Sequence, residues 1–200
     1  MHTNPPPKTE ITRDDIMAMS EYAKVRAHKR KELVAVKRNR RLAIGPDATF
    51  YFESYATMWS QIHEMLFIER GGEAQIEDEL SAYNPLVPKG HELVATIMFE
   101  IDDPVRRKAV LGRLGGVEET VTIQFAGETI HGVPEADVDR TTAEGKASSV
   151  QFIHFPFTPG QIEKFRQPAV QVVVGIGHEH YGHMSVMPDA MRDELAKDFA

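Results

Sequence analysis

The chain has 200 residues, of which 42% are hydrophobic and 26% are charged, and its formal net charge is -7 at pH 7. This composition is typical of a globular protein and excludes a disordered chain. No apolar run reaches the roughly 18 residues that a membrane-spanning helix needs, and the N-terminus lacks the apolar segment of a signal peptide. We therefore expect a cytoplasmic protein that does not contact a membrane.

Zero cysteines exclude disulfides, thiolate nucleophiles and an iron–sulfur cluster held by cysteine. Any metal ion would have to be held by His, Asp or Glu. The acidic net charge makes nucleic acid an unlikely partner, because binding to phosphates requires a basic surface.

The N-terminal half is predicted to be mainly helical. Residues 1–10 include three consecutive prolines and are expected to form a flexible tail. Thr12 and Asp15 form a capping-box pattern that predicts the start of a long helix, within a basic region that ends in a turn at Gly45. Further along the chain we expect a short strand and two helices, at residues 49–52, 53–70 and 73–83.

The C-terminal half is predicted to be rich in strands, because β-branched and aromatic runs alternate there with turn residues. We expect strands at residues 93–101, 117–126, 129–133, 149–155 and 170–177. Helices are expected at 103–114, 158–167 and 188–199, and a polar loop at 134–147. The predicted fold is a single α+β domain over residues 11–200, helical over 11–90 and sheet-rich over 91–200, with one mainly antiparallel sheet and short connecting helices.

The first candidate site is a histidine cluster that follows the last predicted strand. His178 and His180 would project from the same face if that strand continued, His183 follows closely, and His154 could approach from a neighbouring strand. Imidazole nitrogens with a nearby carboxylate suit iron or zinc. The alternative is that these histidines have polar or stacking roles at a strand end.

The second candidate site is a polar stripe along the helix predicted at 53–70. Glu53, Thr57, Gln61 and Glu64 share one helical face. The stripe does not fit a ferritin-like di-iron centre, because the predicted helices contain no Glu-x-x-His pair. It is either a solvated face or an ion-pair seam.

A complementary basic stripe lies on the first predicted helix, where Arg26 and Arg30 follow Tyr22 at intervals of four residues. If the two helices pack together, these arginines could pair with Glu53 and Glu64. The alternative is an anion or cofactor pocket, because guanidinium groups bind carboxylate or phosphate in a bidentate manner. The basic run Lys37 to Arg41 could also contact RNA or an acidic protein, although such runs are common on ordinary surfaces.

Three segments are distinctive: Phe52 to Thr57, Tyr83-Asn84-Pro85-Leu86 and Ser148 to Phe152. With these segments the chain resembles a bacterial family known as domain of unknown function 3501. The resemblance covers nearly the whole chain from about Ile11, and Tyr83-Asn84-Pro85-Leu86 is its most specific part. Members of that family are typically encoded beside a rubrerythrin and an iron–sulfur oxidoreductase. The resemblance therefore implies a role near peroxide or iron handling, with one of these proteins as partner, but it implies no catalytic residue.

Three functional hypotheses follow from these observations. The protein could be an accessory protein of an oxidative-stress or redox system that binds iron or zinc through its C-terminal histidines. It could instead be a metal-free interaction subunit that docks a redox partner through its basic helix and the helix at 53–70. The third hypothesis is a non-haem metal enzyme, which would need the same histidines and an open coordination position.

Overall fold

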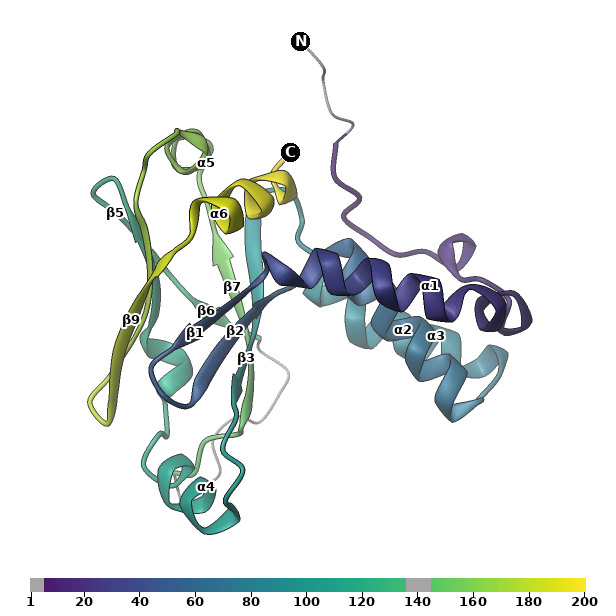
Figure 1. The fold of residues 1–200 in the computed structure, drawn as a ribbon, viewed down its shortest axis with the longest axis horizontal. Coiled ribbons are helices and arrows are strands. Elements are labelled where there is room, and N and C mark those ends of the chain that lie inside the picture. Colours follow the sequence, from purple (N-terminus) through teal and green to yellow (C-terminus); the bar gives the residue numbers. More distant parts are fainter. Residues whose placement is uncertain (1–5, 136–144) are drawn as a thin grey trace.

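Two antiparallel sheets face each other, and a layer of helices covers the outer face of one of them, as Figure 1 shows. The structure is a computed structural model that describes residues 6–135 and 145–200. The predicted α+β class is confirmed. The first part of the predicted tail (1–5) and most of the predicted loop (136–144) lie outside the described residues.

The helical segments, in chain order, are η1 (Arg13–Asp15), α1 (Met19–Arg38), α2 (Tyr55–Glu69), α3 (Glu73–Tyr83), η2 (Asn84–Leu86), α4 (Pro104–Leu111), η3 (Val117–Thr120), α5 (Pro159–Arg166), α6 (Asp189–Leu195) and η4 (Ala196–Asp198). The strands are β1 (Arg41–Ile44), β2 (Ala48–Phe52), β3 (Glu92–Phe99), β4 (Val121–Phe125), β5 (Glu128–His131), β6 (Val133–Pro134), β7 (Val150–Pro156), β8 (Val172–His178) and β9 (Tyr181–Met187).

The expectation of one sheet is wrong, because the strands divide between two. The five-stranded sheet has the order β1-β2-β3-β7-β6, and the four-stranded sheet has the order β5-β4-β8-β9. All strand pairs are antiparallel. Alternation along a strand predicts which side chains are buried but not which strand is the neighbour, so the sequence did not reveal the division.

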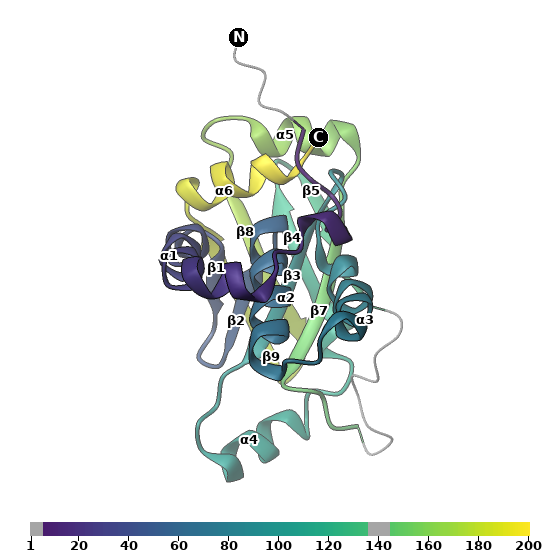
Figure 2. The same ribbon diagram turned by 90° about the vertical axis from the view of Figure 1, so that its right-hand side faces the viewer.

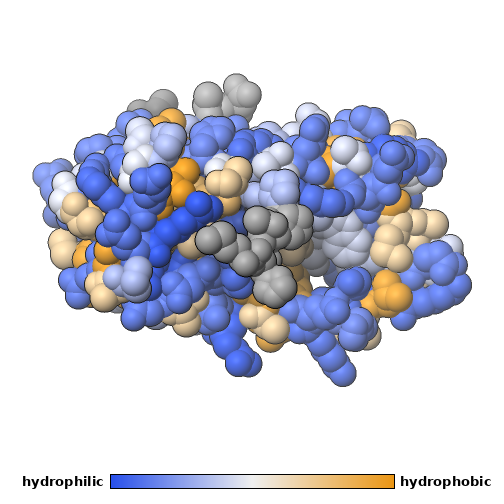
Figure 3. Space-filling model, turned by 90° about the horizontal axis from the view of Figure 1, so that it is seen from above, coloured by the Kyte–Doolittle hydropathy of each residue, from blue (hydrophilic) through white to orange (hydrophobic). Residues whose placement is uncertain are grey.

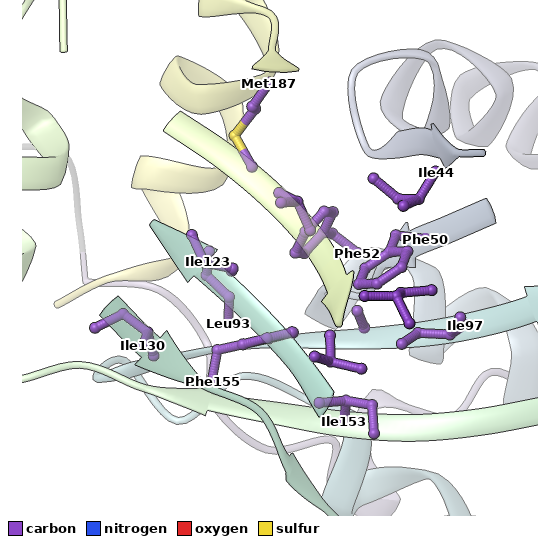
Figure 4. Close-up of a cluster of buried hydrophobic side chains, with 14 of the residues drawn as sticks. Ile44, Phe50, Phe52, Leu93, Ile97, Ile123, Ile130, Ile153, Phe155 and Met187 are labelled. Atoms are coloured by element: carbon purple, nitrogen blue, oxygen red, sulfur yellow. The ribbon is translucent and has the colours of Figure 1, made fainter. Parts of the chain in front are cut away.

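The core of this β-sandwich lies between the two sheets. Figure 4 shows side chains of both sheets in this cluster, with Phe50 and Phe155 from the five-stranded sheet and Ile123 from the four-stranded sheet. All three side chains are completely buried. Helices α5 and α6 add apolar side chains to the same cluster at one end of the sandwich, and α4 lies at the other end (Figure 1).

The sheets meet along one edge, where β9 lies beside β1. The hydroxyl of Tyr181 in β9 donates to the carbonyl of Ile44 and accepts the backbone N–H groups of Asp47 and Ala48, each at 2.8 Å. Ser185 donates to the carbonyl of Ala43 at 2.7 Å. A polar seam from β9 therefore holds the turn between β1 and β2.

The helical layer consists of η1 and α1 to α3. In Figure 2, α1 lies at one side of the layer and α3 at the other. A second apolar cluster joins α2 and α3 to the outer face of the five-stranded sheet, with Ile62, Leu80 and Val94 among its members. The side chain of Asn84 binds the backbone N–H and C=O of Ile11, both at 2.8 Å, which fixes the chain before η1.

Two strands, one helix start and one strand start differ from the sequence-based expectation. Residues 117–120, expected to begin a strand, form the helical turn η3. The Thr12 capping box closes only the single turn η1, and the Met17 N–H donates to His63, so α1 begins at Met19. The residues expected to continue the basic region towards Gly45 form β1, and those after the histidine cluster form β9. Both strands are at sheet edges and depend on their pairing with β2 and β8. Within the described residues, no helix is sufficiently long and apolar to span a membrane.

Candidate functional site

The three C-terminal histidines do not converge on one point. β8 ends at His178 and β9 starts at Tyr181, so Glu179 and His180 form a two-residue hairpin turn. The expectation that His178 and His180 share a strand face is therefore wrong, because the strand does not continue. Their ring centroids are 5.8 Å apart, and the His183 ring packs edge-on against Tyr181 at 4.6 Å.

Both ring nitrogens of His178 have partners within the protein. Nδ1 accepts the backbone N–H of His180 at 3.2 Å, and Nε2 lies 3.2 Å from the carbonyl oxygen of Gly115. Because Nδ1 is an acceptor, Nε2 carries the proton and donates to Gly115. These contacts describe a strand-end histidine with a structural role.

His154 belongs to a different part of the molecule. It lies on β7, whose neighbours are β3 and β6, whereas β8 belongs to the other sheet, so the expectation of a neighbouring strand is wrong. Its Nδ1 is 3.0 Å from Glu92 and its Nε2 is 2.6 Å from Glu135. The hydrogen bond to Glu92, helped by that to Glu135, raises the pKa of His154. The ring is thus a bridge between two carboxylates, with no nitrogen left for a metal.

The residues predicted to hold iron or zinc do not fit a metal site. Over residues 6–135 and 145–200, no group of three or more His, Asp or Glu side chains is positioned to hold a metal ion. We therefore derive no metal-dependent step from His154, His178, His180 and His183.

The polar stripes of α1 and α2 meet at Arg26 and Glu64, whereas Arg30 forms no ion pair with a described residue. Arg26 forms a bidentate pair with Glu64 at 2.9 and 2.8 Å, and the Tyr22 hydroxyl donates to the same carboxylate at 2.8 Å. The guanidinium of Arg26 holds the pKa of Glu64 below its usual value, and burial raises the pKa of Tyr22 to about 12. This arrangement is an internal ion-pair seam, the structural alternative to an anion pocket.

Among the described residues, no arginine side chain pairs with the carboxylate of Glu53. Glu53 precedes the N-cap of α2 and is only 8% exposed. Its two carboxylate oxygens accept hydroxyl groups from Thr57 at 2.6 Å and from Thr96 at 2.7 Å. Thr57 is held in turn by the N-terminal capping box with Ser54. The local start of α2 and the neighbouring strand β3 therefore fix the Glu53 side chain.

Glu53 and Gln61 line one cleft of about 280 Å³. The cleft lies in the corner between the helical layer and the outer face of the five-stranded sheet. Its lining comes from the end of α1, from β2, from α2 and from β3: Lys37, Arg40, Tyr51, Phe52, Glu53, Thr57, Met58, Gln61, Thr96 and Met98. The predicted candidates Arg26, Arg30 and Glu64 are not part of this lining.

A buried network of hydrogen bonds around Arg40, which also lines the cleft, was not predicted from the sequence. Arg40, 4% exposed, binds both oxygens of Asp198 at 2.9 and 2.7 Å and donates to the backbone carbonyl of Glu53 at 3.1 Å. Burial raises the pKa of Asp198, and Arg40 opposes that shift. The two partners are 158 residues apart in sequence, so no local pattern could have revealed the pair.

The outer face of α1 is a second candidate surface. Helix α1 contains seven Lys or Arg and two Glu residues, yet the whole chain has a net charge of -7. Ion pairs with Glu21 and Glu32 neutralise Lys24 and Lys29. The outer face consists of exposed residues that form no ion pair with any described residue: Ala27, Arg30, Lys31, Val34, Ala35 and Arg38.

The fold and these surfaces define a class of protein: an antiparallel β-sandwich with an added helical layer, a polar corner cleft and a basic outer helix. The chain belongs to the family described as protein of unknown function (DUF3501), whose model matches residues 10–199. A comparison with curated proteins gave no significant match.

Among solved structures, the fold is similar to the crystal structure of a protein of unknown function from Burkholderia pseudomallei. The TM-score is 0.87 and the sequence identity is 33%, over 95% of this chain and 99% of that chain. The likeness therefore extends over the sandwich and the helical layer together.

Proposed function

We propose that this protein is an interaction subunit that docks an acidic surface of a redox partner protein through the outer face of α1. The supporting observation is the concentration of unpaired cations on one exposed helix of an acidic protein. The proposal requires no metal ion in this chain.

The geometry of α1 suits docking. Its inward side buries only Tyr22, and the rest of its length remains accessible. Arg30, Val34 and Arg38 are four residues apart and follow one line along the helix. Val34 is 67% exposed, so an apolar contact is available at the centre of a basic surface. Interfaces commonly combine an apolar centre with a charged rim.

Charge complementarity favours an acidic protein over a nucleic acid. An extended phosphate backbone would also approach the negatively charged remainder of this chain, which repels it. A compact acidic patch on a protein can contact α1 without approaching those negative charges. Opposite charges across such an interface accelerate association and define orientation, and their effect falls with ionic strength. Figure 3 shows that hydrophilic residues predominate on the face of the molecule seen from above Figure 1.

The proposed partner is a rubrerythrin or an iron–sulfur oxidoreductase, the two classes that the family resemblance implies. This choice rests on the family rather than on the geometry of α1. The geometry supports only the sign of the partner's surface charge.

The test is a binding titration of the full-length protein against the purified rubrerythrin and oxidoreductase from the same genome, at low and high salt. The variant Arg30→Glu/Arg38→Glu should weaken binding about tenfold or more, because like charges then face each other. The matched control Lys108→Glu/Arg113→Glu makes the same change of net charge. Lys108 is an exposed residue of α4 and Arg113 is an exposed residue just after it, and α4 is remote from α1 in Figure 1.

The control variant should bind like the wild type, and EDTA should leave the affinity unchanged. Equal losses in both variants would point to a non-specific charge effect and contradict the proposal. Absence of saturable binding to either protein would reject the partner class.

A further inference from the structure

The corner cleft contains polar groups that the interaction surface does not use. Its floor is the Glu53 carboxylate, and its rim carries Lys37 at the end of α1 and Gln61 on α2. Lys37 is seven residues from Arg30 and lies on the same side of α1, but no residue of the outer face lines the cleft. The cleft is therefore a separate candidate site.

The floor of the cleft favours a hydrogen-bond donor with positive charge. Glu53 accepts one hydroxyl group on each carboxylate oxygen, and a carboxylate offers about four acceptor positions. Arg40 cannot neutralise it directly, because its guanidinium is bound to Asp198 and to the backbone of Glu53. A ligand ammonium would satisfy the remaining acceptor positions in a buried setting, where charge-assisted hydrogen bonds are strong.

The rim favours a negative group. Lys37 is exposed and forms no ion pair with the described part of the chain, and the Gln61 amide likewise has no hydrogen-bond partner among those residues. An ammonium and an amide can together hold a ligand carboxylate. The lining also includes the apolar side chains of Met58 on α2 and Met98 on β3, beside the polar side chains of Tyr51 and Thr96.

We propose that the cleft binds a small zwitterion of the α-amino acid class. Its ammonium would lie on Glu53, its carboxylate at Lys37 and Gln61, and its side chain against the methionines. The volume of about 280 Å³ is just below the usual range of ligand pockets, which begins at about 300 Å³, and therefore suits only a small molecule. A dianion would be repelled by Glu53, and a polyamine would be repelled by Lys37.

The experiment uses the twenty free L-amino acids as individual probes, in thermal-shift measurements followed by calorimetry on the full chain. Methylamine and acetate serve as half-ligands. At least one amino acid should bind saturably, and each half-ligand should bind about tenfold or more weakly, because it lacks one charge-assisted contact.

Two variants test the assigned contacts. Lys37→Met should weaken the amino acid about tenfold without unfolding the protein, since this side chain is exposed. Glu53→Gln should weaken it further, and retained far-UV circular dichroism would show that this variant folds. The control Lys31→Met, on the outer face of the same helix, should leave the affinity unchanged.

The outcomes separate this inference from partner docking. The variant Arg30→Glu/Arg38→Glu should bind the amino acid like the wild type even where it loses its protein partner. If no amino acid binds saturably, or if Lys31→Met weakens binding as much as Lys37→Met does, the zwitterion site is rejected, and the docking proposal is unaffected.

Discussion

Phe50, Ile123 and Phe155 are completely buried between the two sheets, whereas the 20 residues of α1 bury one side chain, Tyr22. The sandwich is held mainly by apolar packing, whereas α1 contacts α2 through the hydrogen bonds of Tyr22 and Arg26 to Glu64 and through the packing of the Tyr22 ring on aromatic side chains of α2. Apolar packing tolerates little change in volume, but a helix attached through few side chains keeps most of its surface available. This difference explains why both candidate binding surfaces involve the helical layer.

The largest effect is expected from Phe155→Ala in the sandwich. Deletion of a completely buried aromatic ring should lower the free energy of unfolding by about 3–5 kcal/mol. Urea titration measures it by circular dichroism and by the fluorescence of Trp59, the single tryptophan, which reports on the helical layer. Val133→Ala, at a half-exposed edge position, should change the stability by less than about 0.5 kcal/mol. Similar losses in the two variants would contradict the account of the core.

The next effect concerns the connection between the two regions, the buried pair of Arg40 and Asp198. Arg40→Met should cost about 3 kcal/mol, because it leaves a buried carboxyl group without its cation. The double variant Arg40→Met/Asp198→Leu should recover most of this loss in the same urea titration. If the double variant is as unstable as the single one, the cost arises from packing rather than from the unpaired charge.

A smaller effect is expected in the seam between α1 and α2. Tyr22→Phe removes only the hydroxyl that donates to Glu64, so the loss should be about 1 kcal/mol. Hydrogen exchange should show faster opening of α1 amides, while the sandwich strands remain protected. Uniform acceleration in both regions would show that α1 does not open independently.

The smallest effects are pH-dependent and have opposite signs in the two regions. Burial lowers the pKa of His63 in the helical layer, and the carboxylates of Glu92 and Glu135 raise the pKa of His154 on β7, from the usual value of 6.5. The stability that depends on neutral His63 is present above pH 6.5 and is lost as the pH falls through its lower folded-state pKa. The contribution of His154 is fully present below pH 6.5 and is lost as the pH rises through its higher folded-state pKa.

Stability curves of His63→Gln and His154→Gln against pH test this contrast. The difference between His154→Gln and the wild type should be largest at low pH and shrink above the folded-state pKa. On acidification, His63→Gln should lose less free energy of unfolding than the wild type does. Parallel curves for both variants would contradict the assigned protonation states.

Local patterns predicted much of the secondary structure. Helix α3 occupies the predicted residues 73–83, and the predicted strand at 49–52 differs from β2 by one residue. Capping residues and apolar periodicity act over a few neighbouring positions, so they are visible in one sequence. β1 and β9 escaped prediction because both are edge strands that become regular only by pairing with β2 and β8.

The candidate site was predicted only in its local parts. Helical spacing anticipated the contact of Arg26 with Glu64 and placed Glu53 and Gln61 on one side of the helix predicted at 53–70; both line the cleft, although Glu53 lies before the N-cap of α2. It could not show that Glu53 turns towards hydroxyl groups, one of which, on Thr96, comes from a strand 43 residues away. Nor could it show that His154 and His178 belong to different sheets.

The sequence by itself determined the α+β class, the basic character of α1 and the exclusion of cysteine chemistry, because these follow from composition and short-range spacing. The family followed from the resemblance of whole sequence segments, and the family model confirms it. The tertiary structure alone decided the division into two sheets, the separation of the histidines and the formation of the corner cleft. Each of these depends on contacts between residues far apart in the chain, whose partners are selected by the packing of the whole fold.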